Sequence, residues 1–220
     1  MTPDFNMILA NEEIRTYITQ ADASLIALGF TEHSFAHVTK CAHAAASLLE
    51  QLGYDARHVE LAKIAGYMHD IGNVVNRSDH AQSGAVMAFR ILDKLGMSPE
   101  DIAVVITAIG NHDEHTAFPV NAVAAALILA DKTDVRRSRV RNRDTITFDI
   151  HDRVNYAVTE ADLVLTMESG ELALHLTIDT NICAVMDYFE IFMSRMLLCR
   201  KAAEFFSLKF RLCINGTMVM

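Results

Sequence analysis

The chain has 220 residues, of which 51% are hydrophobic and 21% charged, and its formal net charge is −9. This length fits one domain, or one domain with a small second lobe, and the composition excludes a disordered chain. The negative charge disfavours a general nucleic-acid-binding surface, because phosphate binding draws on an excess of basic residues. The four cysteines lack CxxC spacing, which excludes a zinc ribbon and fits a reduced cytosolic protein. Eight of the ten histidines fall between His33 and His115, and this clustering needs an explanation.

Targeting and membrane signals are not visible in the sequence. The first residues lack a basic start followed by a long apolar run. The most apolar stretch, residues 120–130, is shorter than the roughly 20 residues that a membrane-spanning helix needs. We therefore expect a soluble, cytoplasmic protein without a membrane partner.

The first two thirds of the chain have the apolar spacing of helices. The clearest start is Ser98 as N-cap, with Pro99 in the first turn and the acidic Glu100 and Asp101 at the positive end of the helix dipole. Start signals and glycine stops together predict helices over 11–29, 34–52, 56–68, 81–95, 98–109 and 122–135.

The pattern changes near Thr145. Apolar residues then alternate with polar ones, which predicts strands around 154–158, 163–167 and 172–178, with a hairpin turn at 168–171. A long helix over 182–206 and a last strand over 208–214 follow. The expected fold class is α+β. An all-helical bundle occupies residues 1–144, and residues 145–220 form a small antiparallel sheet of three to four strands covered by one helix. The second lobe is expected to form a homodimer or to shape the pocket.

Six residues in the helical part have side chains that commonly bind first-row transition metals. Neutral imidazoles and carboxylates are the usual ligands of such ions. The doublet His69-Asp70 closes a predicted helix, and Gly72 is expected to let the chain leave that helix sharply, so that both side chains face one pocket. A single histidine in a helix is more often structural, but the joint pattern is more specific. The six candidate metal ligands are His37, His69, Asp70, His80, His112 and Asp131.

The order of these residues on helices resembles the HD superfamily of metal-dependent phosphohydrolases. The resemblance covers residues 31–134 and includes LAKIAGYMHDIGN at 61–73 and LILADKTD at 127–134. It implies a helical bundle around a metal cluster, and hydrolysis of phosphate esters, commonly of nucleotides or cyclic dinucleotides. It also implies the ligands of two metals. The first would be held by His37, His69, Asp70 and Asp131, and Asp70 would bridge to a second held by His80 and His112.

The chain departs from the family pattern at three places. Two are departures from the two-metal branch that hydrolyses cyclic dinucleotides, and the third is a departure from many family members. Asn111-His112-Asp113 stands where that branch has two adjacent histidines, and Ala117-Phe118-Pro119 stands where it has Gly-Tyr-Pro. Asn73 occupies the place of a lysine found in many members. These departures argue against cyclic-dinucleotide hydrolysis.

Two carboxylates are the predicted catalytic residues. Asp70 would act as the bridging ligand, and Asp113 would position the water or complete the second site. The histidine-rich set favours Mn, Fe, Co, Ni or Zn over Mg, and two ions are expected. His33, four residues before His37, is predicted either to support the site or to be exposed to solvent, and His115 is a candidate substrate contact.

A basic run over residues 132–143 lies just after Asp131. Arginine side chains match phosphate oxygens bidentately. Lys132 and Arg136, together with Arg77, are the predicted substrate-binding residues. Most of the other arginines are expected to be structural, in pairs with nearby acidic residues. These are Asp134, Asp144 and Asp149.

The predicted function is hydrolysis of a phosphate ester of a nucleotide or another small molecule through metal-activated water. Two alternatives stay open: a non-catalytic HD module that binds a nucleotide or a partner, and an iron-dependent HD-type oxygenase. The missing GxGxxG, GxxxxGK[ST], GxSxG and HExxH motifs exclude the usual dinucleotide-binding, P-loop, hydrolase-elbow and thermolysin-type chemistries.

Overall fold

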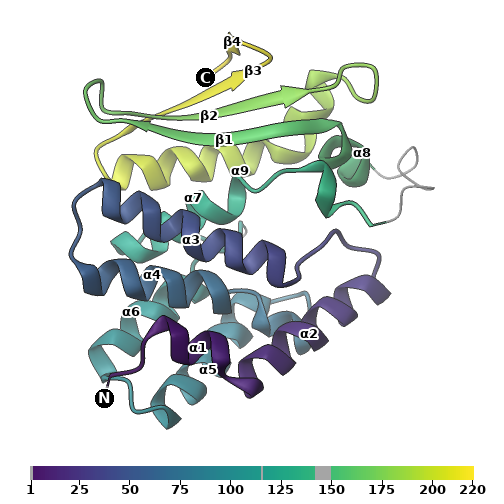
Figure 1. Cartoon of the computed structure of the whole chain (residues 1–220). Coiled ribbons are helices and arrows are strands. Elements are labelled where there is room, and N and C mark those ends of the chain that lie inside the picture. Colours follow the sequence, from purple (N-terminus) through teal and green to yellow (C-terminus); the bar gives the residue numbers. More distant parts are fainter. Residues whose placement is uncertain (1, 115, 142–149) are drawn as a thin grey trace. The chain divides into compact units, whose positions relative to one another are not determined.

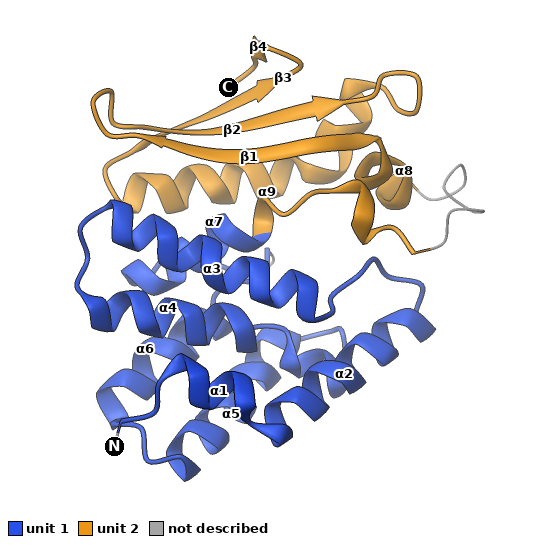
Figure 2. Ribbon diagram, viewed as in Figure 1, with its two compact units in different colours: residues 1–131 blue, residues 132–220 orange. Residues whose placement is uncertain are grey.

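The computed structural model describes residues 2–114, 116–141 and 150–220 (Figure 1). The chain divides into two compact units, residues 1–131 and 132–220 (Figure 2). The helices are α1 (Phe5–Ala10), α2 (Glu12–Ala27), α3 (Phe35–Gln51), α4 (Ala56–Met68), α5 (His80–Lys94), α6 (Pro99–Gly110), α7 (Ala122–Lys132), α8 (Ile150–Ala157) and α9 (Val185–Phe205). Short 3-10 turns are η1 (Ile71–Val74) and η2 (Arg137–Arg139), and the strands are β1 (Val158–Thr166), β2 (Glu171–Ile178), β3 (Lys209–Ile214) and β4 (Thr217–Met218).

Capping side chains begin most helices of the first unit, α5 being an exception. The Ser98 hydroxyl accepts a hydrogen bond from the Asp101 amide, and Asn11 caps α2 in the same way through the Ile14 amide. Each cap satisfies an amide that has no partner within its helix. The predicted helices of this unit are confirmed to within a few residues, but α1, capped by Asp4, was not predicted.

Helices α3 and α4 approach each other closely at Gly66. A Cβ atom on Gly66 would lie 2.6 Å from the Ala42 Cα atom, so only glycine fits at this contact. Ala42, Ala45 and Leu49 on α3 are fully buried. This approach sets the distance between the helix that carries His37 and the helix that ends at His69.

The second unit is a four-stranded sheet in the order β1-β2-β3-β4, with α9 along one face (Figure 1). The β1–β2 hairpin and the β3–β4 pair are antiparallel, whereas β2 and β3 are parallel. Apolar residues at alternate positions of β2 and β3 are buried, and Cys213 of β3 is buried as well. The alternate residues form the core of this unit: Leu172, Leu174, Leu176, Ile178, Phe210, Leu212 and Ile214.

The α+β fold class is confirmed, with two corrections in the second unit. The sheet is mixed rather than antiparallel, because α9 connects β2 to β3 and such a crossover allows a parallel pair. Residues 154–157, predicted as part of a strand, belong to α8. The side chains of Val154 and Ala157 are fully buried, so the residues here follow the helical period of three to four.

The boundary between the units also lies elsewhere than expected. The predicted boundary at residues 144–145 falls outside the described residues, and the units divide after Asp131 instead. The segment after Asp131 belongs to the second unit because its arginines bond within that unit. Arg137 donates to the Tyr156 carbonyl at 2.6 Å, and Arg139 donates to the Asp134 carbonyl at 2.8 Å.

Among the described residues, none of the helices combines the length and apolar character needed to cross a membrane. The four cysteines are free thiols with buried side chains.

We expect Gly66→Ala to destabilise the protein by about 1–3 kcal/mol, the usual cost of overpacking. The clash is with backbone atoms of α3, so it should outweigh the roughly 1 kcal/mol that alanine gains over glycine in a helix. Urea unfolding measures the difference. Gly110→Ala is the matched control, because its Cβ would meet only the Ala85 Cβ at an ordinary 3.7 Å. Equal stability of the two variants would contradict the close packing of α3 and α4.

Candidate metal centre

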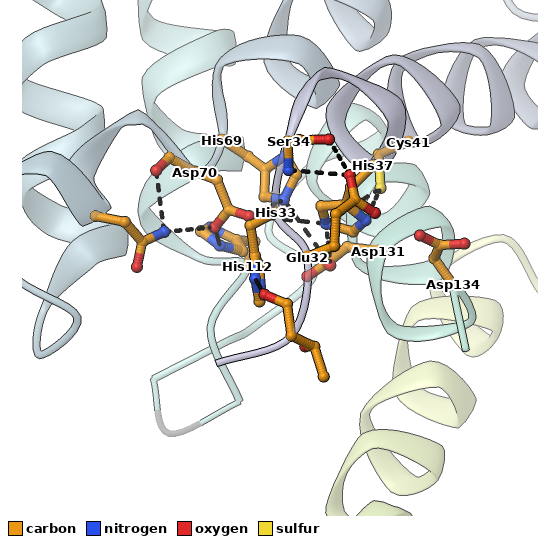
Figure 3. A network of polar contacts seen from close by, with 12 residues as sticks. Glu32, His33, Ser34, His37, Cys41, His69, Asp70, His112, Asp131 and Asp134 are labelled. Carbon is orange, nitrogen blue, oxygen red and sulfur yellow. Dashed lines mark hydrogen bonds and ion pairs between the residues drawn. The ribbon is translucent and has the colours of Figure 1, made fainter. Parts of the chain in front are cut away.

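The six predicted ligands all lie in the first unit, and the structure brings them together. His37 is in the first turn of α3, His69 ends α4, and Asp70 follows directly. His80 begins α5, His112 follows the end of α6, and Asp131 is next to last in α7. The four histidine side chains and Asp70 are buried. Figure 3 shows most of this cluster, with its side chains converging from these different elements.

One group of ligand atoms surrounds the Oδ2 oxygen of Asp70. The Nε2 atoms of His69 and His37 lie 3.3 and 3.7 Å from this oxygen. The same two nitrogens lie 3.8 and 3.3 Å from the Oδ1 oxygen of Asp131. Two imidazoles and two carboxylates thus converge on one point, which we call the first site.

A second group surrounds the other oxygen of the same carboxylate. The Nε2 atoms of His80 and His112 lie 3.6 and 3.9 Å from the Oδ1 oxygen of Asp70. These two nitrogens are 3.1 Å from each other. We call this group the second site. Asp70 therefore faces each site with a different oxygen, as a bridging ligand would.

Backbone carbonyls determine which nitrogen each imidazole presents to the cluster. The Nδ1 atom of His69 lies 2.8 Å from the Gly66 carbonyl oxygen. His80 and His112 make the same contact three residues back, at 3.0 and 2.6 Å. A carbonyl oxygen only accepts, so Nδ1 must carry the proton, and a neutral ring then presents its Nε2 lone pair to the centre. This arrangement is typical of histidines that bind metals.

The cluster contains buried polar atoms that a cation would satisfy. His69 Nε2 and Asp70 Oδ2 are buried and make no hydrogen bond of acceptable geometry, although they are 3.3 Å apart. In the second site, two Nε2 lone pairs face each other at 3.1 Å, which is unfavourable without a positive charge between them. Bond lengths of about 2.0–2.2 Å in a tetrahedral site place neighbouring N and O ligands about 3.3–3.6 Å apart. The residues present therefore fit a divalent first-row metal in each site.

The charges of the cluster also shift its pKa values. Burial alone would lower the pKa of His69, but the carboxylates of Asp70 and Asp131 outweigh burial and raise it. Burial would raise the pKa of Asp70, but His69, and with it His33 and His80, hold that pKa well below its usual range. The cluster therefore stabilises positive charge beside an ionised Asp70.

The turn between Asp70 and His80 is shaped by Gly72 and Asp79. A Cβ on Gly72 would lie 2.0 Å from the His80 carbonyl oxygen and 2.5 Å from the Gly84 amide nitrogen. Gly72 thus serves close packing of η1 against α5 rather than a sharp exit from α4. Asp79, just before His80, has a left-handed backbone with φ of 57°. This local strain turns the chain into α5 at the histidine.

Sequence reasoning missed the part that Cys41 takes in the cluster. Its Sγ atom lies 3.6 Å from His37 Nδ1 and donates to the Ala130 carbonyl at 3.8 Å. Cys41, His37, His69 and Asp131 offer potential ligand atoms within 4.8 Å of one another. The signal was present in the sequence, because a residue four positions after His37 shares its helix face.

The other candidate residues have different positions. His33 lies beside the cluster, with its ring 5.5 Å from that of His37 and its Nδ1 atom 2.7 Å from the Thr31 carbonyl oxygen. Asp113 is half-buried after His112, but it does not belong to the groups of converging ligand atoms found in the described residues. Its catalytic role stays a prediction. His115 lies outside the described residues.

The predicted substrate-binding residues fall in both units. Arg77 lies in the first unit beside the second site, where its Nη1 atom donates to the side-chain Oδ1 oxygen of Asn73 at 3.2 Å. Lys132 and Arg136 belong to the second unit. Arg136 pairs with Asp134 at 3.0 Å, as expected for a structural arginine, so its substrate role and that of Lys132 stay predictions. Arg143, Asp144 and Asp149 lie outside the described residues.

We expect Asp70→Asn to weaken Mn²⁺ binding by more than about 100-fold, since the loss of residues that merely support ligands already costs 10–100-fold. Equilibrium dialysis with metal analysis measures bound Mn²⁺ per chain. Asp93→Asn, an exposed residue of α5, removes the same charge outside the cluster and should leave binding unchanged. An Asp70→Asn protein that keeps both ions would contradict the bridging role.

Metal affinity should fall as the pH falls. A metal binds neutral imidazole, so protons compete for His69. Because the pKa of His69 is raised, this competition should already operate above the usual histidine pKa of about 6.5. Mn²⁺ titrations at several pH values between about 5.5 and 8 measure it. Affinity that stays constant across this range would show that no histidine of the cluster binds the ion.

Two comparisons with known proteins find a similarity to this chain. The HD domain family model matches residues 34–190, well over half of the chain. A similar solved structure is that of a predicted HD superfamily hydrolase from an uncultured Thermotogales bacterium. It has 24% sequence identity and a TM-score of 0.45, and the match covers 56% of this chain and 67% of that one. The search of curated proteins finds no match. On the family match, the chain belongs to the HD domain family.

Proposed function

We propose that this protein is a metal-dependent hydrolase that cleaves a phosphate ester of a nucleotide or another small molecule. The observation that carries the proposal is the position of Asp70. One carboxylate faces two histidine pairs with its two oxygens, at 3.3 and 3.7 Å on one side and 3.6 and 3.9 Å on the other. Such a carboxylate is suited to hold two ions side by side.

Divalent ions bound there would supply Lewis acidity, both to activate water and to neutralise phosphoryl oxygens. The residues of the chain hold the site ready for them. Three backbone carbonyls orient His69, His80 and His112, so the ligands need little rearrangement. Arg77 supplies a guanidinium beside the second site, where it would bind a phosphate oxygen of the substrate.

The two alternatives make different chemical demands. A regulatory module that does not turn over substrate would tolerate the loss of ligands, yet all six predicted ligands are present and converge. An iron-dependent oxygenase would use the same ligand types, so only its reaction separates it from a hydrolase. The phosphohydrolase is favoured because a positively charged residue, Arg77, adjoins the cluster.

A phosphatase screen tests the proposal. The purified protein, loaded with Mn²⁺, is assayed for phosphate release from p-nitrophenyl phosphate, bis-p-nitrophenyl phosphate and a panel of nucleoside phosphates. We expect hydrolysis of at least one, lost by more than about 1000-fold in Asp70→Asn, a loss typical for removing a central catalytic group. Arg77→Ala should raise KM more than it lowers kcat.

The same preparations are analysed for metal content and oxygen consumption. A protein that binds metal but releases no phosphate from any substrate would contradict the proposal. Oxygen consumption with bound iron would favour the oxygenase instead, and an inert protein without bound metal would favour the regulatory module.

A further inference from the structure

We propose that Asn73 is a positioning residue that couples Arg77 to the bridging carboxylate of Asp70, and that it thereby sets the metal affinity of the second site. The inference rests on the metal centre of the proposed function. It concerns a residue that contributes no ligand atom, and it assigns to a buried amide the control of one of the two sites.

The first contact of Asn73 is with the bridging carboxylate. Asn73 is 2% exposed, and its Nδ2 atom donates to the Oδ1 oxygen of Asp70 at 2.9 Å and to the Asp70 carbonyl at 3.0 Å. Oδ1 is the oxygen that faces His80 and His112. A carboxylate oxygen has two lone pairs, so one can accept from Asn73 while the other stays directed at the second site. The amide thus holds the Oδ1 oxygen in its place before the second site.

The second contact of Asn73 is with Arg77. The Nη1 atom of Arg77 donates to the Asn73 Oδ1 oxygen at 3.2 Å, and the guanidinium lies over the Phe30 ring, 5.5 Å from its centre. The backbone carbonyl of Arg77 accepts from His80 Nδ1 at 3.0 Å. Arg77 is therefore linked to the second site twice, through its own carbonyl and through the amide of Asn73.

The chemistry of an amide suits this position. Asn73 donates to Asp70 from its nitrogen and accepts from Arg77 at its oxygen, whereas a lysine could only donate. The first site uses the other oxygen of Asp70, Oδ2, which Asn73 does not contact in the described structure. Loss of Asn73 should therefore weaken the second site much more than the first.

Mn²⁺ titration of the metal-free full-length chain tests the coupling without any substrate. We expect two binding steps in the unchanged protein. In Asn73→Ala, the affinity of one step should fall by about 10–100-fold, the usual cost of losing a residue that orients a ligand, while the other step changes by less than about threefold. Asn76→Ala is the matched control, because Asn76 is exposed and its side chain accepts only from the Ser78 amide at 2.9 Å among the described contacts. It should leave both steps unchanged.

Arg77→Ala supplies an independent measurement. If Asn73 transmits the effect of Arg77, Arg77→Ala should lower the affinity of the same step by about 3- to 10-fold, a coupling usual for contacting residues, and should have no further effect in the Asn73→Ala background. Urea unfolding shows whether the variants are folded. If Asn73→Ala does not fold, the same titration is made with Asn73→Ser, which keeps a short polar side chain, and with Arg77→Ala.

Two results would overturn the inference. One is a folded Asn73→Ala protein in which the Mn²⁺ affinities of both binding steps fall equally, or in which neither falls. The other is a double variant in which the effects of Asn73→Ala and Arg77→Ala on metal affinity add fully. The proposed function fails separately: a protein that shows the coupling but hydrolyses no phosphate ester contradicts only that function. A phosphohydrolase whose metal binding is indifferent to Asn73 contradicts only this inference.

Discussion

The first unit is organised around the burial of one ionised carboxylate among imidazoles. Asp70 is 5% exposed, and a buried charge is tolerated only when it is paired and hydrogen-bonded. Its Oδ1 oxygen receives the amide of Asn73, whereas its Oδ2 oxygen makes no hydrogen bond within the described structure. The carbonyls that fix three imidazoles direct further lone pairs toward the same point. Two of these acceptors, His69 Nε2 and Asp70 Oδ2, are buried without a hydrogen bond, which costs stability, and a bound cation would offset that cost.

The helices bring these groups together because two glycines allow close approach. At Gly66 the absence of a side chain lets α4 lie against Ala42 of α3, and at Gly72 it lets η1 lie against the first turn of α5. Gly66 also supplies the carbonyl that orients His69, one turn before the end of the helix. Packing and ligand orientation are therefore linked, since a shift of α4 would move the histidine and its carbonyl together.

Much of the centre could be predicted from the sequence, because its ligands lie on helices with regular apolar spacing and clear caps. Two contacts could not be predicted: that of Cys41 with the Ala130 carbonyl joins two helices, and those of Asn73 depend on the shape of the turn after α4. The second unit was harder to predict. Val154 and Val158 are spaced equally well for a strand and for one helical turn, and the buried residues of α8 follow the helix. The parallel pairing of β2 with β3 is set by the long crossover through α9, and local alternation does not encode such a pairing.

The net charge of −9 raises the question of how such a protein would attract a phosphate. Two arginines of the second unit already have partners, because Arg136 pairs with Asp134 and Arg137 donates to a backbone carbonyl. Arg77 differs, because its guanidinium donates to the neutral side-chain amide of Asn73. An amide orients the positive charge without cancelling it, whereas a carboxylate in that place would neutralise it. Attraction for an anion would therefore be local to the metal centre, where bound cations and Arg77 would act over a few ångströms.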